Sequence, residues 1–194
     1  MPTVIGATLE DFNRSELEKR GQIAPKNDVD DRAKLLAGKE IQWTASKKKN
    51  AQLAADALNE HGFNASTENP SGNKTPKRFA AIGSPTNGIL VNPSSDYWSD
   101  PVAMAKANYE SGHLSTDHPM GVLLHEIGHT VFEPYGHWLT DSQKHIAGQV
   151  GRYAASNPKE FVSEVYAGTN TGKTYSPEVM NLFKATAKPK GGWK

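Results

Sequence analysis

The sequence predicts an α+β fold that is mostly helical, with a small mixed sheet packed beside a helix that carries the motif His125-Glu126-Ile127-Gly128-His129. Three observations indicate this fold. Helix start and stop signals recur along the chain, two short apolar segments flank an Asn-Gly turn signal, and apolar residues around the motif recur at helical spacing. With 194 residues, the chain can bury a core within one domain of ordinary size.

Residues 1–75 are polar and rich in helix formers, and they are expected to form a helical region that could pack on the same domain. Alternation around Ile41 and Trp43 is typical of a strand, and Ser46 is a favourable helix cap with Gly62 as the stop. The expected elements are, in chain order, a helix over 9–20, a helix over 30–37, a strand over 40–45, a helix over 46–61 and a loop over 64–77.

Residues 76–187 carry strands, turn signals and most of the histidines, and they are expected to form the main domain, followed by a flexible tail over 188–194. The pair Asn87-Gly88 is a turn signal between two strands. A capping residue followed by proline predicts three helix starts, at positions 100, 157 and 176. The expected elements are strands over 78–83 and 88–92, and helices over 100–112, over the motif, over 140–155, over 157–168 and from 176.

Composition excludes several classes of function. The chain has no cysteine, so disulfides, thiolate zinc sites and a cysteine nucleophile are all excluded. The net charge of +1 gives no basic field for nucleic acid, and no apolar run approaches the length of a membrane span. No signal peptide is recognised. We therefore expect neither a nucleic acid nor a membrane as partner, and a protein that is cytoplasmic, virion-associated or delivered by a non-classical route.

The motif helix carries the residue types of a zinc site within one turn. Positions i and i+4 project from the same face of a helix, so His125 and His129 can direct two imidazoles at one cation. Glu126 lies about 100° round the helix, where its carboxylate can take a proton from the attacking water without ligating the metal. The motif therefore predicts Zn²⁺ as the cofactor and Glu126 as the general base.

Two imidazoles leave a zinc site incomplete, so a third protein ligand is needed. A metzincin would have glycine and histidine where Phe132 and Tyr135 stand, which excludes that arrangement. His137, just after the helix, and His145, within a later one, are candidates, although each is more typical of a loop or surface position. The remaining candidates are glutamates on a second helix, as in gluzincins.

Glu160 and Glu164 lie one turn apart on the helix expected to start at Asn157, so their carboxylates share a face. Glu160 also has the spacing of a capping box with Asn157, which is the alternative to metal ligation. Glu164 is either a solvated position or an acceptor that fixes the tautomer of a ligand histidine. Spacing alone leaves open which glutamate binds the metal.

Four residues of the segment 153–164 carry a resemblance to a known family. Tyr153 stands seven residues before Glu160, an aromatic residue follows at Phe161, and Glu164 comes four residues after Glu160. In these positions the chain resembles the anthrax lethal factor catalytic domain. It is also similar to the metallopeptidase domains attached to phage head-morphogenesis proteins and bacterial polymorphic toxins.

The resemblance covers residues 78–170 and implies a zincin-like metallopeptidase domain of the gluzincin type. In this family, Glu160 would be the third zinc ligand, Glu164 would hold a ligand histidine, and Tyr153 would stabilise the oxyanion. The implied function is a zinc-dependent endopeptidase acting on a protein or peptide, with a phage capsid or host protein as target. A non-catalytic zinc-binding virion or scaffold protein with a peptidase fold is the alternative, although an intact Glu126 favours an enzyme.

Two further features lie near the predicted site. The strand over 88–92 could bind an extended peptide by backbone pairing if it lies at a sheet edge. His113 and His118, which precede the motif helix, are expected to be loop or capping residues, with contact to a substrate pocket as the alternative.

Overall fold

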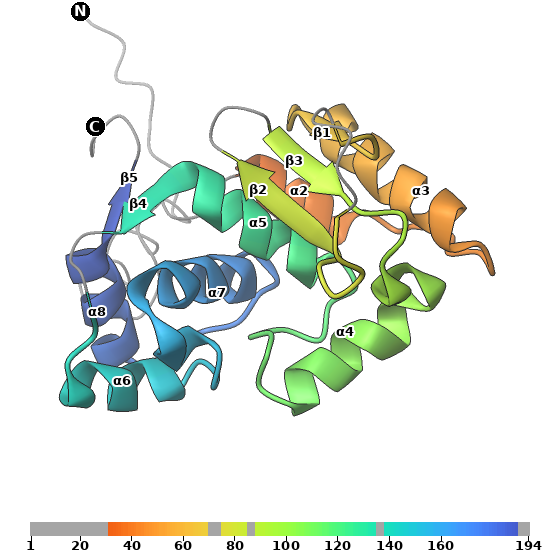
Figure 1. Cartoon of the computed structure of the whole chain (residues 1–194). Helices are drawn as coiled ribbons and strands as arrows, with labels where there is room; N and C mark the ends of the chain where they lie inside the picture. Colours follow the sequence, from red (N-terminus) through yellow and green to blue (C-terminus); the bar gives the residue numbers. More distant parts are fainter. Residues whose placement is uncertain (1–30, 70–74, 85–87, 135–137, 190–194) are drawn as a thin grey trace, which may run out of the picture.

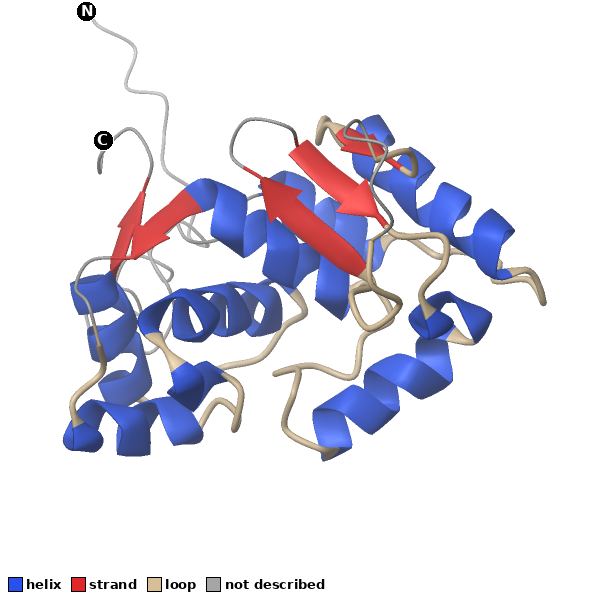
Figure 2. Cartoon of the chain, viewed as in Figure 1, coloured by secondary structure: helices blue, strands red, loops and turns tan. Residues whose placement is uncertain are grey.

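The computed structural model describes residues 31–69, 75–84, 88–134 and 138–189, and it shows a mostly helical α+β protein with a small mixed sheet (Figure 1 and Figure 2). The helix expected over 9–20 lies outside these residues. No helix in the described ranges is both long and apolar enough to cross a membrane. The described helices are α2 (Asp31–Gly38), α3 (Lys47–Glu60), α4 (Pro101–Glu110), α5 (Gly121–Val131), α6 (Asp141–Gly148), α7 (Pro158–Asn170) and α8 (Pro177–Thr186), with 3-10 turns η1 (Asp96–Ser99) and η2 (Ala154–Ser156).

The three-stranded sheet has the order β1-β3-β2, formed by β1 (Ala65–Ser66), β2 (Ala81–Ser84) and β3 (Gly88–Val91). Strand β3 pairs with β2 antiparallel and with β1 parallel, so the sheet is mixed. Because β3 is central, the expectation that it could offer a free edge to a peptide is wrong. The edge strands of this sheet are β1 and β2.

Gly88 starts the central strand with a positive φ of 75°, and a Cβ there would lie 2.2 Å from the backbone oxygen of Asn64. Only glycine fits both the left-handed backbone and this close approach. The glycine of the Asn-Gly turn signal therefore also allows residues 64–66 to approach β3.

Helix α5 lies between the sheet and helix α7, with α8 and α6 beyond α7 (Figure 1). Its side chains Leu123, Leu124 and Ile127 are fully buried, as the helical spacing of apolar residues predicts. Phe161 on α7 is fully buried in the same core. The layers place the motif helix at the centre of the molecule, where the sheet and α7 can both supply groups to it.

A second, two-stranded sheet joins the end of α5 to the C-terminal region. Strand β4 (Phe132–Pro134) pairs antiparallel with β5 (Ala187–Pro189), and Glu133 is opposite Lys188. The first two residues of the expected tail, Lys188 and Pro189, therefore belong to a strand. The helix α5 ends where this strand begins, at Phe132.

The strand expected over 40–45 is wrong, because the backbone there is bound by a side chain instead of a neighbouring strand. The buried amide of Asn50 accepts a hydrogen bond from Thr44 N at 2.8 Å and donates to Thr44 O at 2.8 Å. The same amide donates to Trp98 O at 2.8 Å. The side chain of Asn50 therefore makes the hydrogen bonds to this backbone that a neighbouring strand would have made.

The single helix expected over 140–155 is also wrong, because the structure divides it into α6 and η2. Between them the backbone turns towards the loop after α4, and Tyr153 N donates to Gly112 O at 3.0 Å. Gly151 lies beside the same carbonyl, where a Cβ would be 3.3 Å from it. This break decides where the side chain of Tyr153 points.

Candidate metal centre

Local signals place the two helices that build the site. The turn before α5 ends at Met120, and α5 then continues through both motif histidines. Helix α7 begins at Pro158, and the side chain of Asn157 caps it by accepting hydrogen bonds from the backbone N–H groups of Lys159 (2.9 Å) and Glu160 (3.1 Å). The carboxylate of Glu160 is thus free to extend towards α5 instead of closing the cap.

Gly128 brings these helices close together. A Cβ on Gly128 would lie 2.8 Å from Ser163 Cα and 3.1 Å from Ser163 Oγ, so only glycine permits the observed spacing. Because Gly128 lies between the two motif histidines in sequence, this close contact of α5 with α7 falls at the height of the imidazoles. This contact sets how far the carboxylates of α7 reach across to them.

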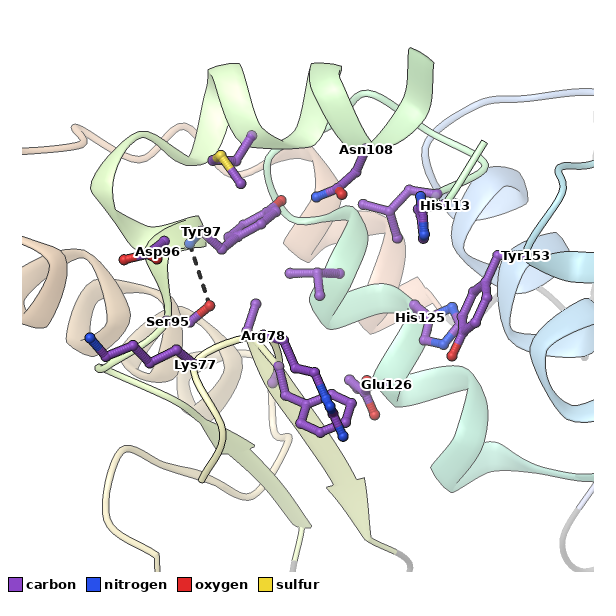
Figure 3. Close-up of a pocket in the computed structure, with 16 residues that line it drawn as sticks. Lys77, Arg78, Ser95, Asp96, Tyr97, Asn108, His113, His125, Glu126 and Tyr153 are labelled. Carbon is purple, nitrogen blue, oxygen red and sulfur yellow. Dashed lines mark hydrogen bonds between the residues drawn. The ribbon is translucent and has the colours of Figure 1, made fainter. Parts of the chain in front are cut away.

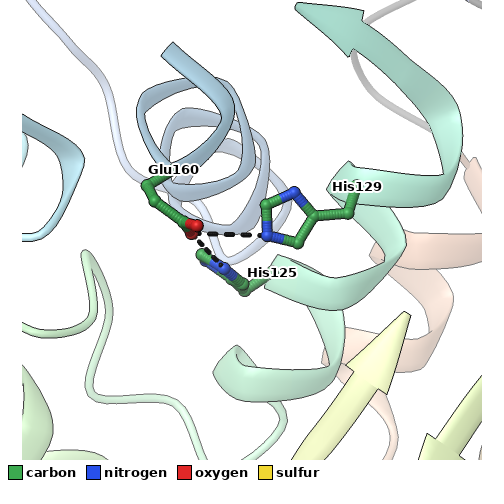
Figure 4. Close-up of side chains that lie close together, drawn as sticks. All are labelled: His125, His129 and Glu160. Atoms are coloured by element: carbon green, nitrogen blue, oxygen red, sulfur yellow. Dashed lines mark ion pairs between the residues drawn. The ribbon is translucent and has the colours of Figure 1, made fainter. Parts of the chain in front are cut away.

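His125, His129 and Glu160 converge on one point (Figure 4), and one ligand atom from each lies within 4.8 Å of the other two. Glu160 Oε2 is 3.0 Å from His125 Nε2 and 3.3 Å from His129 Nε2. These are three ligands of the kind that zinc takes, two imidazole nitrogens and one carboxylate oxygen. A metal site open at its remaining positions fits this arrangement.

Helix α7 also holds the far sides of both imidazoles. Glu164 is 1% exposed, and its Oε1 lies 2.6 Å from His125 Nδ1. Its other oxygen accepts a hydrogen bond from the backbone N–H of Ser115, whose hydroxyl donates to Glu164 O at 2.6 Å. Ser163 Oγ lies 2.9 Å from His129 Nδ1. Each Nδ1 therefore has a partner, which leaves each Nε2 directed at Glu160.

The electrostatics of this cluster favour a cation among its three ligand atoms. Glu164 Oε1 lies 2.6 Å from His125 Nδ1, so its negative charge favours a proton on Nδ1 and leaves a lone pair on Nε2 facing Glu160. Glu160 Oε2 is buried and, apart from the two imidazoles that face it, has no hydrogen-bond partner among the described residues. The lone pairs of His125 Nε2 and Glu160 Oε2, whose atoms lie 3.0 Å apart, repel each other unless a proton or a metal ion lies between them. The donor set therefore fits Zn²⁺, with His125, His129 and Glu160 as ligands.

The pKa values of the metal-free cluster reflect the same attraction for positive charge. Burial lowers the pKa of His125, but Glu164 and Glu160 outweigh burial and raise it to about 10. Burial raises the pKa of Glu160, but hydrogen bonding and attraction to His125 and His129 outweigh this and hold it well below its usual range. A bound cation would replace the extra proton of the histidine.

Glu126 is separate from the ligand cluster and is held by the edge strand. Its Oε2 accepts a hydrogen bond from Gly83 N at 2.6 Å. A Cβ on Gly83 would lie 2.5 Å from Glu126 O, so glycine allows β2 to approach α5 this closely. Burial raises the pKa of Glu126, with His125 and His129 acting in the opposite direction. A carboxylate with a raised pKa beside a metal site can accept and return a proton.

Tyr153 comes from the turn before η2, and its ring stacks on His125 with 5.9 Å between ring centroids and 29° between planes. Burial raises the pKa of its phenol, and the charge of Glu160 and a hydrogen bond with it raise it further, to about 12. The phenol thus remains protonated at neutral pH and can donate a hydrogen bond near the cluster. The side chain is 38% exposed, so it also borders solvent.

The other candidate histidines do not join this group. His145 is exposed on α6 and is not part of the metal-ligand cluster of the described residues, and His137 lies outside those residues. His118 Nδ1 accepts a hydrogen bond from the N–H of Met120, the residue before α5, in keeping with a capping role. His113 is exposed and borders a pocket beside the site.

Sequence reasoning missed three residues that hold the site: Gly83, Ser115 and Ser163. Ser163 could have been found, because it lies three residues after Glu160 and one before Glu164, on the same face of α7. Gly83 and Ser115 contact residues 43 and 49 positions away, and no local signal marks them.

Comparisons with known proteins give no further guide: no family model, curated protein or solved structure matches this chain. Any inference of function therefore rests on the residues and geometry of the chain itself.

Proposed function

We propose that this protein is a zinc-dependent endopeptidase with a zincin-like domain of the gluzincin type. The observation that carries the proposal is the convergence of His125, His129 and Glu160 on one point, with Glu126 beside them and free of the ligand set. A structural metal site needs no adjacent carboxylate held ready for proton transfer, whereas peptide hydrolysis does. The resemblance of segment 153–164 to known metallopeptidase domains points to the same function.

The ligand residues fit zinc, which when bound would polarise the scissile carbonyl and lower the pKa of a coordinated water. Glu126 accepts the proton of the attacking water on its carboxylate and returns it to the leaving amine. The N–H of Gly83 keeps that carboxylate in place during both transfers. Tyr153 donates its phenolic hydrogen bond to the oxyanion that forms on the former carbonyl. Glu164 and Ser163 keep the two imidazoles oriented.

The test compares zinc content and peptide-library cleavage for the wild type, Glu126→Gln and Glu160→Ala. Glu126→Gln should retain zinc and lose cleavage by about 10²–10⁴-fold, because only the proton acceptor is removed. Glu160→Ala should lose zinc and cleavage together. Glu110→Gln is the matched control, since Glu110 is exposed at the end of α4, where its ion-pair partner among the described residues is Lys106. Wild-type cleavage by Glu126→Gln would exclude the proposed mechanism.

The alternative is a non-catalytic zinc-binding virion or scaffold protein, and the same experiment separates it. Zinc bound by the wild type with no peptide cleaved would favour that alternative. The substrate in the leading proposal is a protein or peptide, with a phage capsid protein or a host protein as the target. Neither a nucleic acid nor a membrane has a place in this proposal.

A further inference from the structure

A cavity of about 600 Å³ opens beside the metal centre, between α4, η1, the start of β2 and the first half of α5. Figure 3 shows His125, Glu126 and Tyr153 at one side of this pocket and Lys77, Ser95 and Asp96 at the other. Pockets of roughly 300–1,000 Å³ hold ligands larger than a single side chain. The pocket can therefore bind several residues of a chain that passes the metal centre.

The walls of the pocket are mainly apolar. Met104 of α4 and Val122 of α5 line it, with Leu114 from the loop between these helices. Tyr97 also lines it but is buried, and its hydroxyl donates to Pro119 O at 2.9 Å, so this hydroxyl is already satisfied. A large apolar side chain is the group that such walls would take up from water.

Two exposed cationic side chains border the pocket. Lys77 and Arg78 are exposed neighbours there, and neither forms an ion pair with any residue in the described part of the chain. Asp96, the acidic residue on the same side of the pocket as Lys77, is paired with Lys47 at 2.5 Å. Arg78 lies over the ring of Phe79, 4.8 Å from its centroid, which leaves the guanidinium able to bind a carboxylate.

We propose that this pocket selects the substrate of the peptidase: a protein segment with a large apolar side chain and, within one or two residues of it, a carboxylate. The apolar side chain enters between α4 and α5, and the carboxylate pairs with Lys77 and Arg78. This inference rests on the proposed function, because the segment is held beside the residues that hydrolyse it. Charge complementarity at the rim identifies the partner as an acidic segment.

The test uses the full chain loaded with zinc and labelled peptide pools that hold one Leu, Met or Phe next to Asp, Asn or Lys. Binding is measured with Glu126→Gln, and cleavage with the wild type. The Asp pool should bind and be cleaved best. The double substitution Lys77→Glu with Arg78→Glu should weaken binding of this pool roughly tenfold. Lys48→Glu with Lys49→Glu is the matched control, because these exposed lysines of α3 make the same charge change away from the pocket.

The apolar wall is tested separately with Met104→Trp, which fills the pocket. It should reduce cleavage next to large apolar residues, whereas Val102→Trp, on the exposed face of the same helix, should leave cleavage unchanged. Thermal unfolding of both variants confirms that they fold. Cleavage without preference for the Asp pool, or a preference unchanged by the double reversal, would overturn the pocket proposal alone. Selective binding without any cleavage would instead reject the proposed function and retain the pocket.

Discussion

The close contact of α5 with α7 can be tested by adding a single methyl group at Gly128. In the substitution Gly128→Ala, the new Cβ would lie 2.8 Å from Ser163 Cα. Ser163 Cα belongs to the backbone of α7 and cannot rotate away, so the two helices must separate. Carbon atoms pack at roughly 3.5–4.0 Å, which requires a local separation of about 1 Å.

The balance of free energies predicts a net loss of stability. Overpacking a buried contact costs about 1–3 kcal/mol, whereas alanine gains roughly 0.5–1 kcal/mol over glycine within a helix. The free energy of unfolding should fall as a result, by up to about 2.5 kcal/mol. Because binding sites tolerate displacements of about 0.5 Å, moving Glu160 away from the imidazoles should also weaken zinc binding by roughly tenfold or more.

The assay measures urea unfolding of chelator-treated protein and zinc affinity against a competing chelator. Gly148→Ala is the control, because a Cβ added there, at the end of α6, meets no atom of the other described residues within 4 Å outside its chain neighbours and its own helix backbone. That variant should be slightly more stable than the wild type and should bind zinc equally well. If Gly128→Ala behaved like Gly148→Ala in both measurements, the reasoning from helix spacing to metal affinity would be refuted.

Three further predictions concern the groups around the metal ligands. Glu164→Gln leaves one acceptor oxygen for two donors, His125 Nδ1 and Ser115 N. It should lower zinc affinity about 10–100-fold, as measured by competition with a chelator. An unchanged affinity would contradict the role of Glu164 in orienting the imidazole. Tyr153→Phe should retain zinc and lower kcat by roughly 10²-fold with little change in KM, and a change confined to KM would speak against contact with the oxyanion. The raised pKa of His125, about 10 against 6.5 in the unfolded chain, stabilises the metal-free fold fully below pH 6.5, and this contribution is lost as the pH rises through 10. The urea midpoint with chelator present should therefore fall over this range, and a midpoint that rises would show that the carboxylates do not hold a proton on the imidazole.

The sequence allowed the two site helices to be predicted because their signals are local. The cap and proline at Asn157 and Pro158 mark the start of α7, and the four-residue spacing of the histidines marks one face of α5. Spacing could not decide between Glu160 and Glu164, because both lie on the same face. The structure distinguishes them: Glu160 reaches Nε2 of both histidines, while Glu164 reaches the opposite nitrogen of His125.

The remaining features depend on contacts between distant segments. The strand expected over 40–45 was wrong because the buried amide of Asn50 binds that backbone, and alternation of side chains carries no information about such a partner. The helix expected over 140–155 was wrong because a backbone hydrogen bond to Gly112 draws Tyr153 away from the helical path. Local propensity favours one continuous helix, and tertiary contacts decide otherwise.

One face of α7 supplies nearly everything that fixes the two imidazoles. Glu160 faces both Nε2 atoms, and Ser163 and Glu164, three and four residues later, hold the two Nδ1 atoms. These three positions lie on one face of α7, so any shift or rotation of α7 moves Glu160 and both orienting groups together. Gly128 allows that stripe to approach α5 at the height of the histidines. The geometry of this candidate metal centre is therefore a property of one helix–helix contact, which brings the three possible ligands together without any cysteine.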